Sequence, residues 1–108
     1  MRILDKVFND DTAVTASFAS EHIDMEQQIG VSVQVTWTAA AVSAVATLQT
    51  SNDGVNWVDT ASTVSITGTS GSEMLYATDF HFKYGRANVV FTSGTASTLK
   101  LHVLAKGL

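Results

Sequence analysis

The chain of 108 residues contains no cysteine, no proline and few charged residues. Without cysteine it can form neither a disulfide nor a thiolate metal site, and the redox compartment in which it works stays open. Charged residues make up 15% of the sequence, against about 25% in ordinary domains, and average usage would predict about five prolines. Serine and threonine, 25 residues together, take the place of the missing charges.

The few charges argue against nucleic acid as a partner. The formal net charge is −4, and the six lysine and arginine residues are scattered along the chain. Nucleic-acid binders cluster their basic residues, because phosphate neutralisation supplies much of their affinity. No apolar run approaches the roughly 20 residues of a membrane-spanning helix, and Met1-Arg2-Ile3-Leu4-Asp5 lacks the apolar core of a signal peptide. We therefore expect a soluble protein that binds neither nucleic acid nor membrane.

Alternating apolar and polar residues predict long β-strands. From Ile29 to Thr38 every second residue is apolar, which is typical of a strand with one buried face. The segment from Thr98 to Gly107 repeats this period. A strand from Val42 to Thr50 leads into the turn Asn52-Asp53-Gly54, whose residues tolerate a positive φ. No window keeps an apolar period of 3.6 residues over three turns, and one helical turn within residues 21–28 is the only helical alternative.

Further strands are expected at short, regular spacing. The candidates are Arg2–Phe8, Thr12–Phe18, Ile23–Met25, Thr63–Thr67, Met74–Phe82 and Arg86–Thr92, with another that starts at Trp57. Asn9-Asp10-Asp11 is expected to turn between the first two, and Ser93-Gly94-Thr95-Ala96 to form a hairpin turn into the last strand. About eight or nine strands predict an all-β fold, a single antiparallel β-sandwich of jelly-roll type. It forms one domain over residues 1–108, with the weakest strand patterns in residues 1–20.

Two groups of ionisable residues are candidates for a metal site. Asp79 and His81 share one strand face, and His102 lies on a late strand, pointing away from the core. A second set stands at alternate positions: His22, Asp24 and Glu26. We interpret both as solvated surface residues, since no calcium-loop spacing is present. The chain also lacks a nucleophile motif, a phosphate-binding glycine loop and a carboxylate pair in a cleft. We therefore expect no metal, no cofactor and no enzyme activity.

The aromatic residues are expected mainly in the core. Trp37 ends an apolar strand face, and Trp57 returns an apolar side chain to the core just after the turn, although it adjoins an exposed loop. Phe80, Phe82 and Tyr84 share one strand face, which is more often sandwich core than a stacking platform.

The segment Gln49-Thr50-Ser51-Asn52-Asp53-Gly54-Val55-Asn56-Trp57 resembles a stretch common to small β-sandwich virion proteins of tailed bacteriophages. In those proteins a later strand runs from a tyrosine through an arginine and an apolar run into a Thr-Ser-Gly-Thr hairpin. Here that strand reads from Tyr84 to Thr95. The last strand, from Thr98 to Gly107, is similar as well, so the likeness covers roughly residues 23–108.

This resemblance implies structural roles for the matched residues. Asp53 and Gly54 would form the turn, and Trp57 would pack against the fold. Arg86 is expected to pair with a carboxylate or a carbonyl group, and Gly94 to lie in the hairpin. The resemblance implies a virion structural protein, such as a capsid decoration protein or a tail or adaptor component. Such a protein would form homo-oligomers, dimers or trimers, and bind other virion proteins.

A second hypothesis stays open. The same turn resembles that of discoidin-type and other galactose-binding-like sandwiches, which are longer. It also resembles the Asp-box turn of sialidase propellers, although one copy cannot make a propeller. These likenesses imply a carbohydrate-binding or adhesion module, with Trp57, Tyr84 and His81 as the residues that face a glycan.

Overall fold

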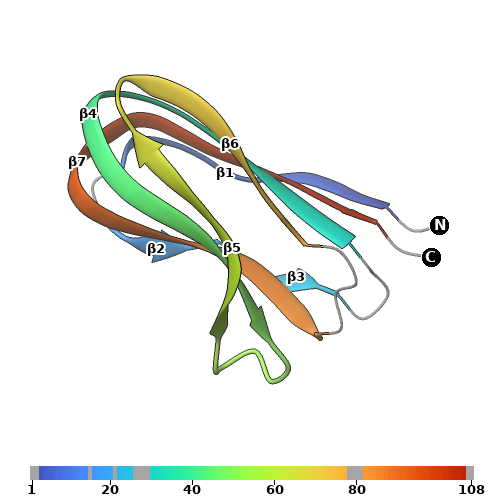
Figure 1. The fold of residues 1–108 in the computed structure, drawn as a ribbon. Helices are drawn as coiled ribbons and strands as arrows, with labels where there is room; N and C mark the ends of the chain where they lie inside the picture. The colour runs from blue at the N-terminus through green and yellow to red at the C-terminus, as the bar shows by residue number, and fades with distance from the viewer. Residues whose placement is uncertain (1–2, 15, 21, 26–29, 78–81, 107–108) are drawn as a thin grey trace.

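Seven antiparallel strands make up the described part of the chain (Figure 1). The computed structural model describes residues 3–14, 16–20, 22–25, 30–77 and 82–106. The strands are β1 (Ile3–Val14), β2 (Phe18–Ala19), β3 (Ile23–Asp24), β4 (Gly30–Ser51), β5 (Val58–Thr67), β6 (Ser70–Ala77) and β7 (Tyr84–Lys106). The all-β prediction is confirmed. Over these described ranges, no helix is long and apolar enough to cross a membrane.

The two longest strands, β4 and β7, define the architecture. They pair with each other along their whole length, from Gly30 opposite Lys106 to Ser51 opposite Tyr84. Both bend near the middle, so that one sheet folds back over itself into two layers (Figure 1). The upper layer has the order β1, β7, β4, β6, and the lower layer has β2 and β3, then β7, β4 and β5. The predicted sandwich is therefore a single sheet whose two central strands belong to both layers.

The bends replace two breaks that the sequence predicts. The expected strands Ile29–Thr38 and Val42–Thr50 are parts of one strand, β4, although Ile29 itself lies outside the described residues. The expected hairpin at Ser93-Gly94-Thr95-Ala96 is wrong, because the chain continues through it as β7. Register shifts between Thr38 and Ala44 allow the paired strands to bend together. The small residues at positions 93–96, which are typical of a turn, instead lie at a bend in the continuous strand β7.

Other boundaries also differ from the prediction. The turn expected at Asn9-Asp10-Asp11 is wrong, since β1 is continuous and only shifts its register between Val7 and Asn9. The helical alternative for residues 21–28 is replaced at its centre by β3, and residues 26–29 lie outside the described ranges. The strand expected at Met74–Phe82 is described to Ala77, where β6 ends.

Gly94 is the residue that allows β7 to bend. Its φ is 81°, in the left-handed region that favours glycine. A Cβ on Gly94 would overlap the carbonyl oxygen of Ala41 and lie 2.9 Å from Cα of Val42, both on the paired strand β4. Because these are backbone atoms, no side chain can move aside to make room. The bend therefore needs glycine for its conformation and for the close approach of the two strands.

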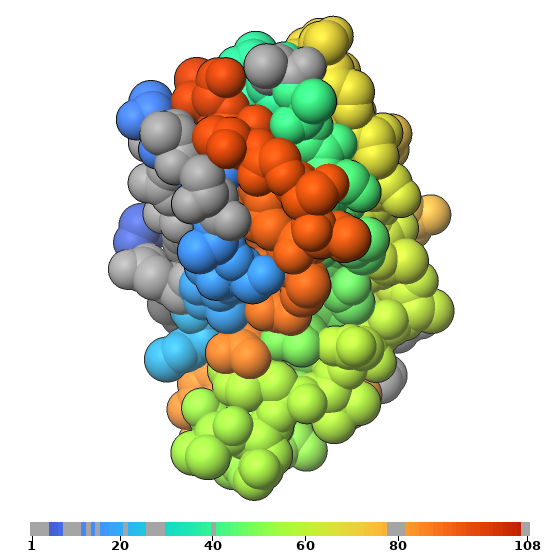
Figure 2. All heavy atoms as spheres, turned by 90° about the vertical axis from the view of Figure 1, so that its left-hand side faces the viewer, coloured from blue at the N-terminus to red at the C-terminus, as the bar shows by residue number. Residues whose placement is uncertain are grey.

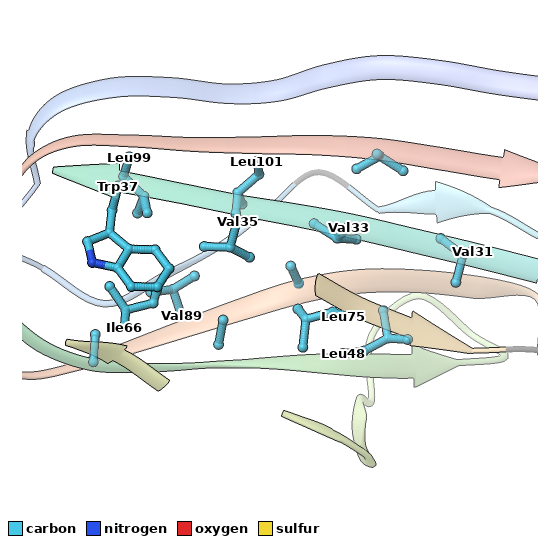
Figure 3. Packing of buried hydrophobic residues seen from close by; sticks show 14 of the residues in the cluster. Val31, Val33, Val35, Trp37, Leu48, Ile66, Leu75, Val89, Leu99 and Leu101 are labelled. Carbon is cyan, nitrogen blue, oxygen red and sulfur yellow. The ribbon is translucent and has the colours of Figure 1, made fainter. Parts of the chain in front are cut away.

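The hydrophobic core fills the space between the layers (Figure 3). Alternate residues of β4 and β7 point inward from both layers, as the period of two predicts. The large labelled side chains come from the upper layer, Val31, Val33, Val35, Trp37, Leu75, Leu99 and Leu101, and from the lower layer, Leu48, Ile66 and Val89. Trp37 is 4% exposed, and its indole N–H donates to the carbonyl oxygen of Thr67 at 3.2 Å. The prediction that Trp37 lies in the core is confirmed.

Replacing Gly94 with alanine should destabilise the protein more than the same change at another positive-φ glycine. Gly68 has a φ of 80°, but a Cβ there would meet nothing within 4 Å. We expect Gly68→Ala to cost about 1–2 kcal/mol for the conformation alone, and Gly94→Ala about 3 kcal/mol or more. Urea denaturation of both variants measures the difference. Equal losses would show that the contact with β4 does not control the bend.

Candidate functional site

The loop between β4 and β5 (residues 52–57) is built around the carboxylate of Asp53. Its Oδ1 accepts the backbone N–H groups of Asn56 at 2.8 Å and Val55 at 2.9 Å. The hydroxyl of Ser51 also donates to Oδ1, and Asn56 Nδ2 donates to Oδ2, both at 2.9 Å. These bonds hold the pKa of Asp53 well below its ordinary value of 3.8. The backbone N–H of Asn56 contributes most and that of Val55 second, because both stabilise the charged carboxylate.

These contacts make Asp53 a turn-forming residue. Four hydrogen bonds end on its carboxylate, three on Oδ1 and one on Oδ2, and all four donors belong to residues 51–56. Gly54 follows with a φ of 74°, and its N–H donates to Ser51 Oγ at 2.9 Å. A Cβ on Gly54 would lie 3.4 Å from Cε2 of Tyr84, so the turn also packs closely on that ring. The turn at Asn52-Asp53-Gly54 forms where the sequence predicts it.

A row of side chains crosses three strands next to this loop. Gln49 of β4 lies in register with Arg86 of β7 on one side and with Asp59 of β5 on the other. Arg86 Nε donates to Gln49 Oε1 at 2.8 Å, and Gln49 Nε2 donates to Asp59 Oδ1 at 2.7 Å. Arg86 thus bonds to a carbonyl group, that of a side-chain amide.

Trp57 lies outside the hydrophobic core, contrary to the prediction. It is half-buried and stands just before β5, which begins at Val58. The guanidinium carbon of Arg86 lies 4.2 Å from the centre of the Trp57 ring, a cation–π contact. The ring packs on the Arg86 side chain and is not part of the hydrophobic core between the layers. One face of the indole is therefore already covered by Arg86.

The other residues expected to face a ligand are placed as follows. Tyr84 is half-buried, with the His22 ring edge-on at 5.0 Å and Lys83 Nζ 5.3 Å from its centre. His81 lies outside the described residues, as does Phe80. Phe82 is 44% exposed, so the prediction of a buried aromatic stripe is wrong at this position.

Neither candidate metal group lies wholly within the described residues. Asp79, His81 and Glu26 lie outside them. His102 Nε2 is hydrogen-bonded to Asp5 Oδ1 on the outer face of the upper layer. In the described ranges, no three His, Cys, Asp or Glu side chains come together as a metal site would require.

An open cleft of about 400 Å³ lies beside the loop. Its lining consists of Thr50, Ser51, Asn52, Asn56, Val58, Asp59, Thr60 and Phe82. The loop projects from one end of the molecule, as the yellow-green atoms at the bottom of Figure 2 show. The sequence signals the turn but not the cleft, because Phe82 reaches it from a segment that lies far along the chain. The bond from the Lys83 N–H to Asn52 Oδ1, at 3.1 Å, joins the two segments.

Comparison with known proteins identifies the fold. No protein-family model matches the sequence, and no curated protein matches it. The structure of the SPBc2 prophage-derived protein YomS aligns with 96% of this chain and 92% of its own, with a TM-score of 0.61 and 12% identity. A structure of Bacillus endospore appendages, a family of disulfide-linked pili, aligns with 98% of this chain and 88% of its own. Its TM-score is 0.59 and its identity 14%. At these identities the similarity is one of fold alone.

Asp53→Asn should destabilise the protein in a pH-dependent way. The folded pKa lies below the unfolded one, so the charged carboxylate stabilises the fold above about pH 4 and loses this effect as the pH falls toward the folded pKa. We expect the variant to be less stable than the wild type at pH 7, and this difference to shrink progressively as the pH falls below about 4. Denaturant titrations at pH 7 and pH 3 test this. Glu73→Gln, which removes an exposed carboxylate on β6, serves as the control; a wild-type advantage that is unchanged at pH 3 would contradict the prediction.

The contact between Arg86 and Trp57 should appear as a coupling energy. In a double-mutant cycle of Arg86→Met and Trp57→Leu, the lost bond to Gln49 cancels and the cation–π term remains. We expect a coupling of about 0.5–1 kcal/mol in urea denaturation. A cycle that pairs Arg86→Met with Tyr76→Leu on β6 should give none. Coupling within error of zero in the first cycle would mean that the stacking does not stabilise the fold.

Proposed function

We propose that this chain is a non-enzymatic structural subunit of a phage-type particle, which forms homo-oligomers and binds further particle proteins. The observation that carries this proposal is a sheet face without charge. On the lower layer, between the loop and the bend, the strand segments 43–48, 60–67 and 87–93 contain no charged residue. We name the outer surface of these three segments the neutral face.

Two exposed valines lie at the centre of the neutral face. Val45 of β4 and Val90 of β7 are directly paired in register and are 42% and 48% exposed. Their neighbours are hydroxyl and amide side chains, which lose less on desolvation than charged groups. The central parts of protein interfaces are depleted of charge in the same way. The outer face of the upper layer differs, because it carries Lys100, His102 and Lys106.

The sheet edges favour association through a face instead of an added strand. On one edge, the N–H of Tyr76 in β6 donates to Ser62 Oγ in β5 at 3.0 Å, which links the two layers. On the other edge, β1 carries the exposed charges of Asp5 and Lys6 and shifts its register after Val7. Charged residues and bulges of this kind discourage strand addition.

The similar structures give this proposal a context. One comes from a prophage-derived protein and the other from pili, which are assemblies of many subunits. Those pili are disulfide-linked, whereas this chain has no cysteine, so its own assembly would be non-covalent. A stable contact of this kind buries about 1,200–2,000 Å² in total.

Light scattering coupled to size-exclusion chromatography tests the proposal. We expect the wild type to form a dimer or trimer, and Val45→Lys with Val90→Lys to shift it to monomer, because two buried charges would be unpaired in the interface. Thr36→Lys, which adds charge to the exposed surface of the upper layer, is the matched control and should leave the oligomer intact. A wild-type monomer at every concentration up to the millimolar range would overturn the proposal.

A further inference from the structure

The strand β1 is attached to the rest of the fold along one side only. It pairs with β7 from Ile3 opposite Lys106 to Val14 opposite Ala96, and in the strand order it lies at the edge of the upper layer. Apart from β7, no described strand has a Cα atom within 8 Å of β1. The contacts that join β4, β5, β6 and β7 to one another therefore do not involve β1.

The row of β1 residues opposite the buried positions of β7 is largely polar. Three residues of this row lie in register with β7 residues that are at most 1% exposed: Lys6 with Val103, Asn9 with Leu101 and Asp11 with Leu99. Apolar residues occur in the row only toward its ends, at Leu4 and Val14. Of the apolar β1 side chains that the structure describes, Val7 and Val14, only Val14 packs against the core. Backbone pairing with β7 therefore holds β1 more than burial in the core does.

The edge of β7 that β1 covers requires a partner strand. On its other side β7 pairs with β4, and its residues Leu99, Leu101 and Val103 are buried. Without β1, backbone groups along residues 96–106 of β7 would lose their bonds beside the hydrophobic core, which is costly. An open strand edge of this kind is a template for another chain. The sequence of β1 satisfies it equally well whichever copy of the chain supplies the strand.

Two features specify the register of β1 on β7. His102 Nε2 is hydrogen-bonded to Asp5 Oδ1 across the two strands. The register shift between Val7 and Asn9 fixes how the two halves of β1 align, as bulges do in other sheets. A β1 strand from a second copy would be aligned on this edge by the same two features.

The segment that follows β1 is anchored by side-chain bonds to β7. Residues 15–17 lead from β1 in the upper layer to β2 in the lower layer (Figure 1). Ser17 Oγ accepts the N–H of Phe91 at 2.9 Å. Ser20 donates its N–H to the carbonyl oxygen of Ala87 at 2.8 Å, and its Oγ accepts the Ala87 N–H at 3.0 Å. The point at which β1 can separate from its own chain is therefore the short connection before Ser17, and short connections favour exchange between copies.

We propose that β1 is exchanged between copies of this chain, so that residues 3–14 of one subunit pair with residues 96–106 of the next. The pairing keeps the register seen within one chain. Exchange between two copies closes a dimer, and exchange around a ring closes a trimer. It adds no strand to the sheet, so the charged outer edge of β1 is unchanged. This inference rests on the proposed function: the neutral face brings the copies together, and the exchanged strand then links them.

Two cysteines placed across β1 and β7 report the exchange, because the chain has none of its own. In Thr12→Cys/Thr98→Cys the two positions are exposed and directly opposite in register, as a disulfide requires. Oxidation of the assembled protein should join different copies, so a denaturing gel without reductant should show covalent dimers or trimers as the main product. Monomers with an internal disulfide as the only product would overturn the proposal.

The matched control is Thr38→Cys/Thr98→Cys. Thr38 of β4 is also exposed and lies opposite Thr98 on its other side, with their hydroxyl groups 2.7 Å apart. Since β4 and β7 stay paired within one chain, this variant should form internal disulfides only. Covalent dimers in the control would contradict the assignment of the link to β1. Asp5→Cys/Leu104→Cys, also opposite in register, replaces the first pair if that variant fails to fold or to oxidise.

Light scattering on the same samples before oxidation separates this inference from the proposed assembly. An oligomer whose disulfides are all internal rejects the exchange and leaves the proposed structural role standing. A monomer at every concentration up to the millimolar range, with internal disulfides only, overturns both.

Discussion

The fold depends on one close contact, where β7 passes β4 at the bend. Gly94 approaches the backbone of Ala41 and Val42 more closely than any residue with a Cβ could. The two strands remain paired on both sides of this point, so the hydrogen-bonded ladder is carried through the bend in register-shifted form. A sheet that bends in this way needs no separate hairpins to build its second layer, because the same strands supply the centre of both layers.

The bend also decides what each sheet face does. Folding the sheet turns one face inward along its whole length, and the alternation of apolar residues then fills the core from both sides (Figure 3). The other face becomes two outer surfaces of different character. One carries lysine and histidine side chains, and the other is the neutral face around Val45 and Val90. The end of the lower layer away from the bend carries the loop (Figure 1), and the cleft lies beside this loop.

Local pattern predicts those features of this chain that are decided locally. The alternation in Ile29–Thr38 is enough to place Trp37 in the core, and Asn52-Asp53-Gly54 is enough to place a turn. The hairpin expected at Gly94 is wrong for a physical reason. A positive φ is needed both in a tight turn and in a bent strand, and only the pairing with β4 separates the two. No local pattern contains that pairing.

The candidate site also depends on contacts between distant segments, which no local sequence pattern contains. The pattern after the turn predicts Trp57 in the core, because large apolar residues are usually buried there. Instead the ring lies before β5 and is covered on one face by Arg86. Phe82 reaches the cleft because β7 begins opposite the end of β4, with Tyr84 paired to Ser51, and because the Lys83 N–H bonds to Asn52. Hydrogen bonds to Asp53 stabilise the turn, and the bond between Lys83 and Asn52 joins it to the segment that carries Phe82. The neutral face and the cleft lie on different parts of the lower layer.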